Sequence, residues 1–262
     1  MEGKVIKTAF MIGAGNVAWH LSTALQQQGI AFSGIYNRTK ASALQLAEKL
    51  QCAFFSSMHE IPNDVDIYFI TTSDQSIVPI SEELPENNGI VVHVSGSTAI
   101  NVIDKKHQRR GVFYPLQTFN KEREVDFHKI PIAIEATNES DEKILERLAL
   151  RLSETVISLT EEQRQALHVA AVFASNFTNY MHALSADILK SNHLDFRLLM
   201  PLIQETAKRA GETDNPFSAQ TGPAVRNDLI TIQKHLDFLF PNEKLKNIYQ
   251  FLTEAIIKEY KQ

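Results

Sequence analysis

One stretch near the N-terminus, residues 7–29 (KTAFMIGAGNVAWHLSTALQQQG), constrains the fold of this chain more than any other. An apolar, strand-like run ends in Gly13-Ala14-Gly15, and a helical pattern follows directly. The order of strand, glycine turn and helix is typical of the first half of a Rossmann-type βαβ unit. Ala18 occupies the position where a third glycine is common, and its small side chain still permits the helix to pack against the strand.

The same turn predicts a binding site for the pyrophosphate of a dinucleotide. One glycine allows the tight turn, the next lets the backbone approach the phosphates, and the amides at the start of the helix face the negative charge. The residues expected to bind the cofactor here are Gly13, Gly15, Asn16 and Val17. An ordinary strand-to-helix turn is the alternative interpretation of these residues.

The end of the second predicted strand, in the segment IYNRTK, favours one type of dinucleotide. NAD sites usually carry an acidic residue about 20 residues beyond the glycines, where it binds the ribose hydroxyls. This chain instead has Asn37, Arg38 and Thr39. The guanidinium of Arg38 suits a 2′-phosphate and its two neighbours offer short polar donors, so the sequence predicts NADP. A solvated surface arginine is the alternative.

Polar residues also follow two later predicted strands. Thr72 and Ser73 lie in FITTSDQSI, and Ser95 and Gly96 lie in VVHVSGS. Ligands of open α/β sheets bind outside the carboxyl ends of the strands, so these four residues are assigned to the cofactor site. Ordinary turn chemistry explains them equally well, and His93 within the second of these strands is consistent with a buried structural histidine.

The pattern of the chain changes near residue 158. Before it, short β-branched runs alternate with helical or turn-rich segments, which predicts a mostly parallel sheet covered by helices. The helices predicted after it cover 161–190, 195–210, a stretch from Pro223 to Leu239, and 242–260. We therefore expect an α/β, Rossmann-type domain over residues 1–158, followed by an all-α domain over residues 159–262 for substrate binding and dimer formation.

Composition excludes several classes of partner. The 262 residues include 26 Lys and Arg against 31 Asp and Glu, a net charge of −5 without an extended basic block, so nucleic acid is an unsuitable partner. Cys52 is the single cysteine, and neither a signal peptide nor a membrane-spanning run is recognisable. We expect a cytoplasmic protein that binds a small molecule, without a membrane partner.

Six motifs spread over most of the chain carry a resemblance to known proteins. The motifs are GAGNVA (13–18), NRT (37–39), HVSGS (93–97), YPLQTF (114–119), LHVAAVFASNF (167–177) and TGPAVRNDLITIQKHL (221–236). The N-terminal part resembles the domain shared by pyrroline-5-carboxylate reductases, 3-hydroxyisobutyrate-type dehydrogenases and deazaflavin-dependent NADP oxidoreductases. The whole chain resembles a family of bacterial Rossmann-like proteins described as NADP oxidoreductases, whose helical C-terminal domain has no assigned function. In that family a histidine commonly precedes the proline where this chain has Tyr114, and an Arg-Gly-Asp stands where it has Arg226-Asn227-Asp228.

The long predicted helix lacks the catalytic lysine of the 3-hydroxyisobutyrate-type group, since no lysine occurs between His168 and Asn179. At 100° per residue, His168, Ser175, Asn179 and His182 instead lie on one side of this helix. Because histidine titrates near neutral pH, His168 is expected to be the proton donor or a substrate anchor, with Asn176 as a hydrogen-bonding neighbour. A solvated face or interhelix hydrogen bonds are the alternative. The histidines have no carboxylate at ligand spacing, so no metal site is predicted.

The segment QTGPAVRNDL opens the next predicted helix. Pyrroline-5-carboxylate reductases place a comparable helix start at the active site, often across a dimer interface. That resemblance implies that Thr221 and Arg226 bind a substrate carboxylate, whereas a plain helix start is the alternative. It also implies a homodimer, which the apolar seams favour because they exceed what a lone four-helix domain needs.

Together these features predict an NADPH-dependent reductase that acts on a small carbonyl or imine compound. The cofactor would supply the hydride, and a side chain such as His168 would supply the proton. An NADP-binding regulatory or scaffold protein without catalysis is the alternative, and the missing lysine favours it.

Overall fold

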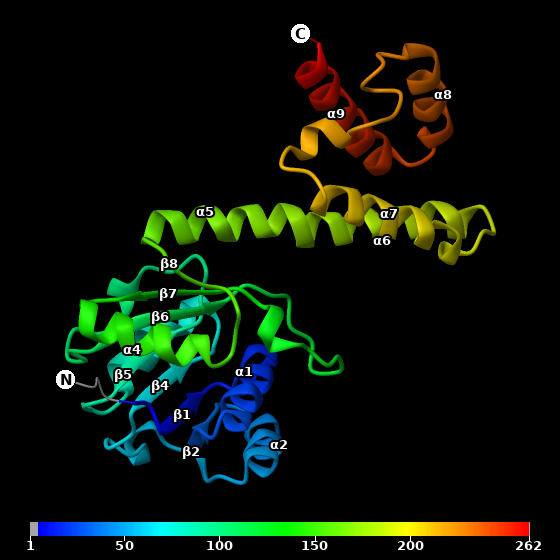
Figure 1. Cartoon of the computed structure of the whole chain (residues 1–262). Coiled ribbons are helices and arrows are strands. Elements are labelled where there is room, and N and C mark those ends of the chain that lie inside the picture. Colours follow the sequence, from blue (N-terminus) through cyan, green and yellow to red (C-terminus); the bar gives the residue numbers. More distant parts are fainter. Residues whose placement is uncertain (1–4, 262) are drawn as a thin grey trace. The chain divides into compact units, whose positions relative to one another are not determined.

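The computed structural model describes residues 5–261, and within this range the N-terminal part of the chain forms one eight-stranded sheet (Figure 1). The strands are β1 (Thr8–Ile12), β2 (Ala31–Tyr36), β3 (Phe54–Phe55), β4 (Ile67–Ile70), β5 (Ile90–His93), β6 (Arg110–Pro115), β7 (Ile132–Ala136) and β8 (Val156–Ser158). Their spatial order is β3-β2-β1-β4-β5-β6-β7-β8. Strands β1 to β6 pair in parallel, β7 is antiparallel to β6, and β8 is parallel to β7. The predicted mostly parallel, Rossmann-type sheet is confirmed. The chain adds β2 and β3 on one side of β1 and then adds β4 and the later strands on the other side, so the order of the strands reverses between β1 and β4.

Helices cover both faces of this sheet because the central strands are apolar on both sides. In β1, Ala9 and Met11 belong to one apolar cluster, whereas Phe10 and Ile12 belong to the other. This alternation follows the two-residue period of a strand, and it buries β4 and β5 completely and β1 from Ala9 to Ile12. The first cluster lies under α1 (Asn16–Gln27), α2 (Lys40–Leu50) and α4 (Glu139–Leu150), and the second includes α3 (Ile77–Glu83).

The chain divides into two compact units, and Asn176 and Phe177 lie on either side of the division. The change of pattern predicted at residue 158 coincides with the end of β8, but the helix that follows, α5 (Glu161–Ala171), belongs to the first unit. A capping box between Thr160 and Gln163 closes the start of α5. The boundary between the units therefore lies after the boundary between strand-containing and all-helical sequence.

The second unit contains helices joined by turns, and no strand, in its described residues, 177–261. Its α-helices are α6 (Thr178–Ser191), α7 (Met200–Gly211), α8 (Leu229–Leu239) and α9 (Glu243–Tyr260). The helix predicted over 161–190 is present as α5 and α6, which are joined by the π-helical segment Val172–Phe177. No strand follows β8 in the described part of the chain, in agreement with the prediction. None of the helices searched over residues 5–261 combines the length and the apolar character that a membrane span requires.

The predicted start of α8 at Pro223 is wrong. The helix begins at Leu229, after Asp228, whose carboxylate accepts a hydrogen bond from the Thr231 amide at 3.0 Å. Asn227 has a φ of +52°, a left-handed conformation that cannot belong to a right-handed helix. Proline favours a first helical turn but does not fix one, and here the cap residue determines where the helix starts.

Candidate functional site

A groove lies at the carboxyl ends of β1, β2 and β4, where the sequence places the cofactor. It brings together seven of the predicted residues, although they come from three separate segments of the chain. These residues are Gly13, Gly15, Asn37, Arg38, Thr39, Thr72 and Ser73. Asn16 and Val17 form the first positions of α1, directly beyond the glycine turn.

The backbone of the glycine turn explains why the sequence needs glycine here. Gly13 has a φ of +111° and donates its amide to the Tyr36 carbonyl at 2.7 Å. A Cβ at Gly13 would lie 2.7 Å from the Thr71 hydroxyl oxygen, which no side chain tolerates. A Cβ at Gly15 would meet no protein atom within 4 Å, so the surface at Gly15 stays open for a ligand.

The start of α1 has the features of an anion-binding site. Gly15 is the N-cap residue and offers no side chain to the first amides, and the first turn contains no acidic residue. The free amides and the helix dipole therefore attract an anion at this point. In the same groove, the hydroxyl oxygen of Thr72 is buried without a hydrogen-bond partner. Such an unsatisfied atom costs free energy unless a ligand bonds to it, so the groove fits a phosphorylated dinucleotide.

Arg38 and its two neighbours have different roles in this groove. Arg38 is exposed, and no hydrogen bond or ion pair holds its guanidinium within the described part of the chain. Asn37 donates to the Thr39 carbonyl at 2.9 Å and shapes the turn, while Thr39 is the N-cap of α2 without a side-chain bond. Glu83, which is exposed, is the acidic residue that also lines the groove. The free cation is therefore supplied by Arg38.

Ser95 and Gly96, the other two residues assigned to the cofactor, lie at the end of β5 and have local partners. The Ser95 hydroxyl accepts the amides of Ser97 at 3.2 Å and Thr98 at 3.1 Å. A Cβ on Gly96 would lie 2.6 Å from Nδ1 of His168. Gly96 is thus required for close packing with His168, and contact of either residue with a cofactor stays a prediction.

His93 is a structural histidine. Its ring is fully buried, Nδ1 accepts the Ser95 amide at 3.2 Å, and Nε2 lies 3.3 Å from the Ala99 carbonyl oxygen. Burial, together with the nearby Arg164 cation, lowers the pKa of His93 to about 4. The imidazole therefore stays neutral at physiological pH and stabilises the turn after β5.

His168 lies in a second pocket, which is formed by the end of β6, the residues after it, and α5 with the π-helical segment. Its Nδ1 is 3.0 Å from the hydroxyl oxygen of Tyr114, and the two rings meet edge to face with centroids 5.9 Å apart. Burial raises the pKa of the Tyr114 phenol, and the Arg164 cation partly opposes this shift. The predicted neighbour Asn176 lines the same pocket, as does Ser175, whose hydroxyl lies 3.1 Å from that of Thr118.

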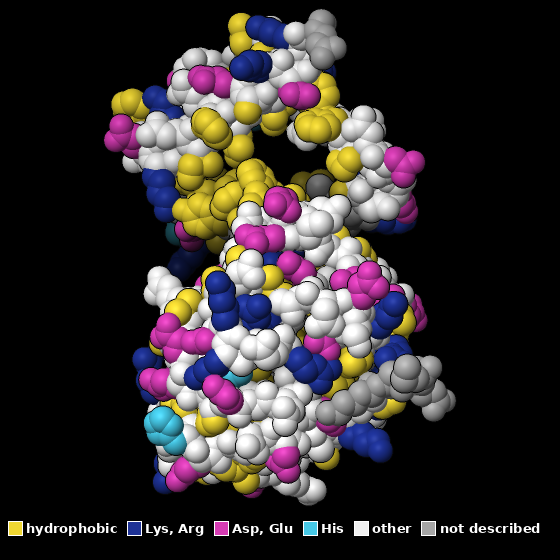
Figure 2. Space-filling view, turned by 90° about the vertical axis from the view of Figure 1, so that its left-hand side faces the viewer, with side chains coloured by type: hydrophobic (Ala, Val, Ile, Leu, Met, Phe, Trp, Pro, Cys, Tyr) yellow, Lys and Arg dark blue, Asp and Glu magenta, His cyan; other side chains and the backbone are white. Residues whose placement is uncertain are grey.

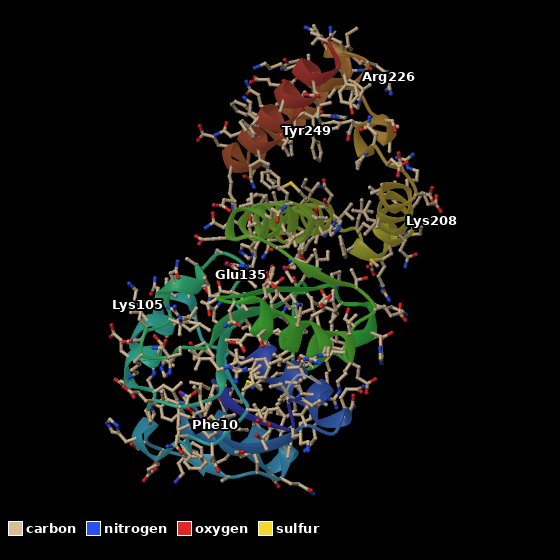
Figure 3. The ribbon with its side chains drawn as sticks, turned by 60° about the vertical axis from the view of Figure 1, so that its left-hand side comes forward. Phe10, Lys105, Glu135, Lys208, Arg226 and Tyr249 are labelled. Carbon is tan, nitrogen blue, oxygen red and sulfur yellow. The ribbon has the colours of Figure 1, made fainter. Side chains whose placement is uncertain are left out.

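A buried ion pair holds this pocket in place. Arg164 on α5 is fully buried, and its guanidinium donates to Glu135 on β7 at 3.0 Å (Figure 3). It also donates to the carbonyl oxygens of Ser95 at 3.2 Å and Gly96 at 3.1 Å. These bonds fix α5 against the ends of β5 and β7, and they account for the close packing of His168 on Gly96. The sequence did not identify Arg164 or Glu135, because no local pattern marks an ion pair between residues so far apart.

The predicted polar stripe along the long helix is only partly correct. The spacing argument assumed 100° per residue, but the π-helical segment has wider turns and shifts the positions that follow it. His168 and Ser175 line the pocket, whereas Asn179 and His182 belong to the second compact unit. Short π-helical segments frequently occur at functional sites, and this one supplies Ser175 and Asn176.

Comparison with known proteins assigns the family. A family model for a domain of unknown function, DUF2520, matches residues 130–256, and a model for shikimate/quinate 5-dehydrogenase matches residues 3–89. A crystal structure from Bacteroides fragilis, titled "putative NADP oxidoreductase", is 38% identical over 97% of this chain and 98% of that chain, with a TM-score of 0.89. The chain belongs to the same family as this Bacteroides fragilis protein, and its residues 130–256 form a DUF2520 domain.

More distant structures share the fold of this DUF2520 protein. Pyrroline-5-carboxylate reductase from Coxiella burnetii is 14% identical over 98% of both chains, with a TM-score of 0.59. A reductive aminase from Aspergillus terreus is 15% identical over 97% of this chain and 95% of that chain, with a TM-score of 0.68. Its structure is described as a complex with NADPH4, cyclohexanone and allyl amine. No curated protein matches the sequence at a significant level. The predicted resemblance to the family and to pyrroline-5-carboxylate reductases is confirmed.

The sequence predicts that two further residues bind a carboxylate of the substrate. Thr221 and Arg226 are in the second unit, in the exposed turns before α8, and Figure 3 labels Arg226 there. Their contact with a substrate stays a prediction.

Tyr114 is noted in the sequence only as a departure from the family pattern, and its position at the carboxyl end of a strand is the available signal for a site residue.

Proposed function

We propose that this DUF2520 protein is an NADP(H)-dependent oxidoreductase that reduces a small carbonyl or imine compound. The observation that carries the proposal is that the groove at the glycine turn and the Tyr114–His168 pair lie at the same carboxyl edge of one sheet, within one compact unit. The names of the related structures, which include NADP oxidoreductase, pyrroline-5-carboxylate reductase and reductive aminase, support the same reaction class.

NADP rather than NAD is the proposed cofactor because Arg38 is an unpaired cation at the end of β2. Guanidinium binds phosphate through two parallel hydrogen bonds, whereas ribose hydroxyls are usually bound by a carboxylate. Asn37 and Thr39 border the guanidinium and would accompany it. Gly13, Gly15, Asn16, Val17, Thr72 and Ser73 would bind the remainder of the dinucleotide, with Ser95 and Gly96 at the end of β5.

The Tyr114–His168 pair is the proposed proton donor. NADPH supplies a hydride when bound, so the substrate must receive one proton from the protein or from water. The raised pKa keeps the Tyr114 phenol protonated at neutral pH, and His168 Nδ1 lies within hydrogen-bond distance of its oxygen. A proton given to the substrate by Tyr114 would be replaced from Nδ1 of His168, whose ring forms part of the pocket wall, and the imidazole would take up a proton from water at Nε2. Asn176 would orient the substrate through its side-chain amide.

Turnover measurements test this proposal. NADPH oxidation is followed with a panel of ketones, ketoacids and cyclic imines, using the wild type, Tyr114→Phe and His168→Ala. We expect one or more substrates, and a decrease of kcat by about 100-fold in both variants, because proton transfer contributes about 10²- to 10⁴-fold to catalysis. Ser185→Ala, in the other unit, is the matched control and should keep wild-type kcat. Wild-type turnover in both variants would contradict the assignment of the proton donor.

A regulatory or scaffold protein that binds NADP without catalysis is the second candidate. The helical segment from His168 to Asn179 has no lysine, so the catalytic group of the 3-hydroxyisobutyrate-type dehydrogenases is missing. Tight NADPH binding without turnover across the whole panel would favour this candidate over the reductase.

We further propose that the protein forms a homodimer through its second unit. Large apolar side chains of this unit are strongly exposed, such as Phe238 at 60%, Phe251 at 71% and Phe240 at 73%, and Figure 2 shows hydrophobic side chains gathered on the helical part. The apolar residues that are buried among its described residues are Leu184, Ala224, Ile232 and Leu239. So few cannot form a core of ordinary size, and a second copy would cover the exposed surface.

The substrate-binding part of the proposal includes this second unit. Thr221 and Arg226 would bind a carboxylate on the substrate, since both side chains are exposed and Arg226 has no ion pair in the described range. Sedimentation measurements should give a dimer, and Phe251→Glu should shift the dimer toward monomer.

We also propose a cytoplasmic location, because an unpaired thiol such as that of Cys52 persists in a reducing compartment.

A further inference from the structure

A lysine far from the glycine turn in the sequence contacts the turn directly. The ammonium group of Lys121, in the segment after β6, donates to the Ala14 carbonyl at 2.8 Å. Ala14 is the residue between Gly13 and Gly15. The contact therefore joins the segment after β6 to the backbone that would hold the pyrophosphate.

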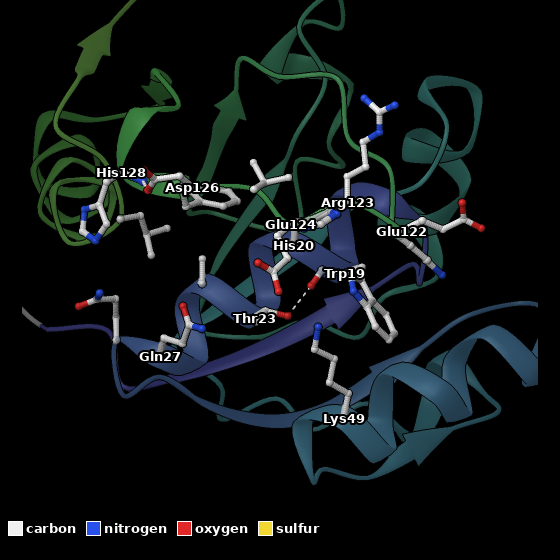
Figure 4. A pocket seen from close by; sticks show the side chains of 16 residues that line it. Trp19, His20, Thr23, Gln27, Lys49, Glu122, Arg123, Glu124, Asp126 and His128 are labelled. Atoms are coloured by element: carbon white, nitrogen blue, oxygen red, sulfur yellow. Dashed lines mark hydrogen bonds between the residues drawn. The ribbon is translucent and has the colours of Figure 1, made fainter.

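Trp19 on α1 completes this arrangement. The ammonium nitrogen of Lys121 is 5.4 Å from the centre of the indole, and that of Lys49 at the end of α2 is 4.0 Å from it. Figure 4 shows the Lys49 side chain directed toward Trp19 from α2. Cation–π attraction holds each lysine near the ring, but it does not neutralise either charge.

The two lysines beside this tryptophan have no carboxylate partner in the described part of the chain, although the cleft is lined by as many carboxylates as Lys and Arg side chains. Neither Lys49 nor Lys121 has an ion pair within residues 5–261. Three carboxylates line the same cleft, but Glu122 and Glu124 are exposed, and Asp126 is 3.3 Å from Lys129 and caps a short helical turn. The N-terminus of α1 adds a positive partial charge, which makes a neighbouring ammonium group unfavourable unless an anion is also present. A pyrophosphate at the glycine turn is such an anion.

We propose that Lys121 is a positioning residue for the cofactor. Its ammonium group holds the Ala14 carbonyl, so that the backbone between Gly13 and Gly15 keeps its amides in place, and its charge favours the pyrophosphate. This inference rests on the proposed binding of NADP. Lys49 shares the indole with Lys121 but makes no contact with the turn, so it provides a matched control.

Two ligands separate the action of Lys121 from other effects on binding. NADPH contains both a 2′-phosphate and a pyrophosphate, whereas adenosine 2′-monophosphate contains the 2′-phosphate but no phosphate at the 5′ position, where the pyrophosphate is attached. Calorimetric titration of the full-length protein gives the Kd of each ligand for the wild type, Lys121→Met, Lys121→Arg and Lys49→Met. Methionine keeps the length of the side chain and removes its charge and its donor.

We expect Lys121→Met to raise the Kd of NADPH about tenfold at low salt, as for a lost charge-assisted hydrogen bond, and to reduce the dependence of the Kd on salt. The Kd of adenosine 2′-monophosphate should change less than about twofold. Lys121→Arg should restore most of the affinity for NADPH, and Lys49→Met should bind both ligands like the wild type.

Three results would overturn the inference. Lys121→Met could bind NADPH as tightly as the wild type, or it could lose both ligands equally, which would mean a general distortion of the groove. Equal losses of NADPH affinity in Lys121→Met and Lys49→Met would mean that the charge of the cleft favours binding, and not the contact of Lys121 with the turn. A wild type that binds neither ligand would contradict the proposed function itself, and this result differs from the other three.

Discussion

The groove at the glycine turn and the Tyr114–His168 pocket lie on the same sheet, but they are built differently. The groove depends on backbone geometry: a positive φ at Gly13, an uncapped helix start, and short polar residues at strand ends. The pocket depends on side chains from β6 and α5, and the buried Arg164–Glu135 pair holds them together. A site built on the backbone tolerates changes in distant side chains, whereas one built on packing does not.

Glu135→Ala should have the largest effect and should affect only the pocket. It leaves the fully buried Arg164 without its carboxylate, and we expect the free energy of unfolding to fall by about 3 to 4 kcal/mol. Urea denaturation measures this change. NADPH affinity should stay within about threefold of the wild type, because the pair contacts none of the residues that line the groove and Arg164 keeps its bonds to the Ser95 and Gly96 carbonyls. A large loss of NADPH affinity in the folded variant would mean that the two sites are not separable.

Acid should destabilise the same region through His93. Its folded pKa of about 4 lies below the ordinary value of 6.5, so the stability it contributes is present above pH 6.5 and is lost as the pH falls toward 4. The expected loss is about 3 kcal/mol, from 2.5 pKa units at about 1.36 kcal/mol each. Denaturation curves between pH 4 and 7 measure it, and His93→Asn should flatten the slope in this range. An unchanged slope in that variant would assign the acid sensitivity to other groups.

Two glycine substitutions separate folding from binding within the groove. Gly13→Ala introduces a Cβ that collides with Thr71 in a backbone conformation that favours glycine, so we expect a loss of about 2 kcal/mol in stability. Gly15→Ala meets no protein atom, so its stability should change by less than about 0.5 kcal/mol, while the Kd of NADPH rises about tenfold. Thermal denaturation and calorimetric titration distinguish the two. A Gly15→Ala variant that binds NADPH with wild-type affinity would contradict the proposed position of the pyrophosphate at this turn.

The difference between the sites also explains what the sequence could predict. The strand, glycine turn and helix are local and periodic, so the sheet and the residues of the groove were correctly placed from the pattern alone. His168 and Asn176, which the sequence selects as polar residues beside an apolar helical seam, line one pocket, and their catalytic role stays a prediction. Tyr114 was missed as a partner of His168, since the contact joins residues 54 positions apart and depends on Arg164 and Gly96.

Errors in the helical part have local physical causes. The π-helical segment changes the angular position of every residue after it, so the predicted stripe from His168 could not extend to Asn179 and His182. The start of α8 depends on the left-handed backbone at Asn227 and on the Asp228 cap, and the sequence TGPAVRND also permits an earlier start at Pro223. Neither a π-helical turn nor a left-handed asparagine has a strong signature in a single sequence.

The most direct test of the account is the choice between NADPH and NADH by the wild type and by Arg38→Ala. The two cofactors differ by one phosphate, and Arg38 is the free cation in the groove. We expect calorimetric titration of the wild type to give a Kd for NADPH at least about tenfold below that for NADH, and Arg38→Ala to make the two values equal by weakening NADPH alone. Equal affinities in the wild type, or a preference that survives in Arg38→Ala, would contradict the proposed NADP site.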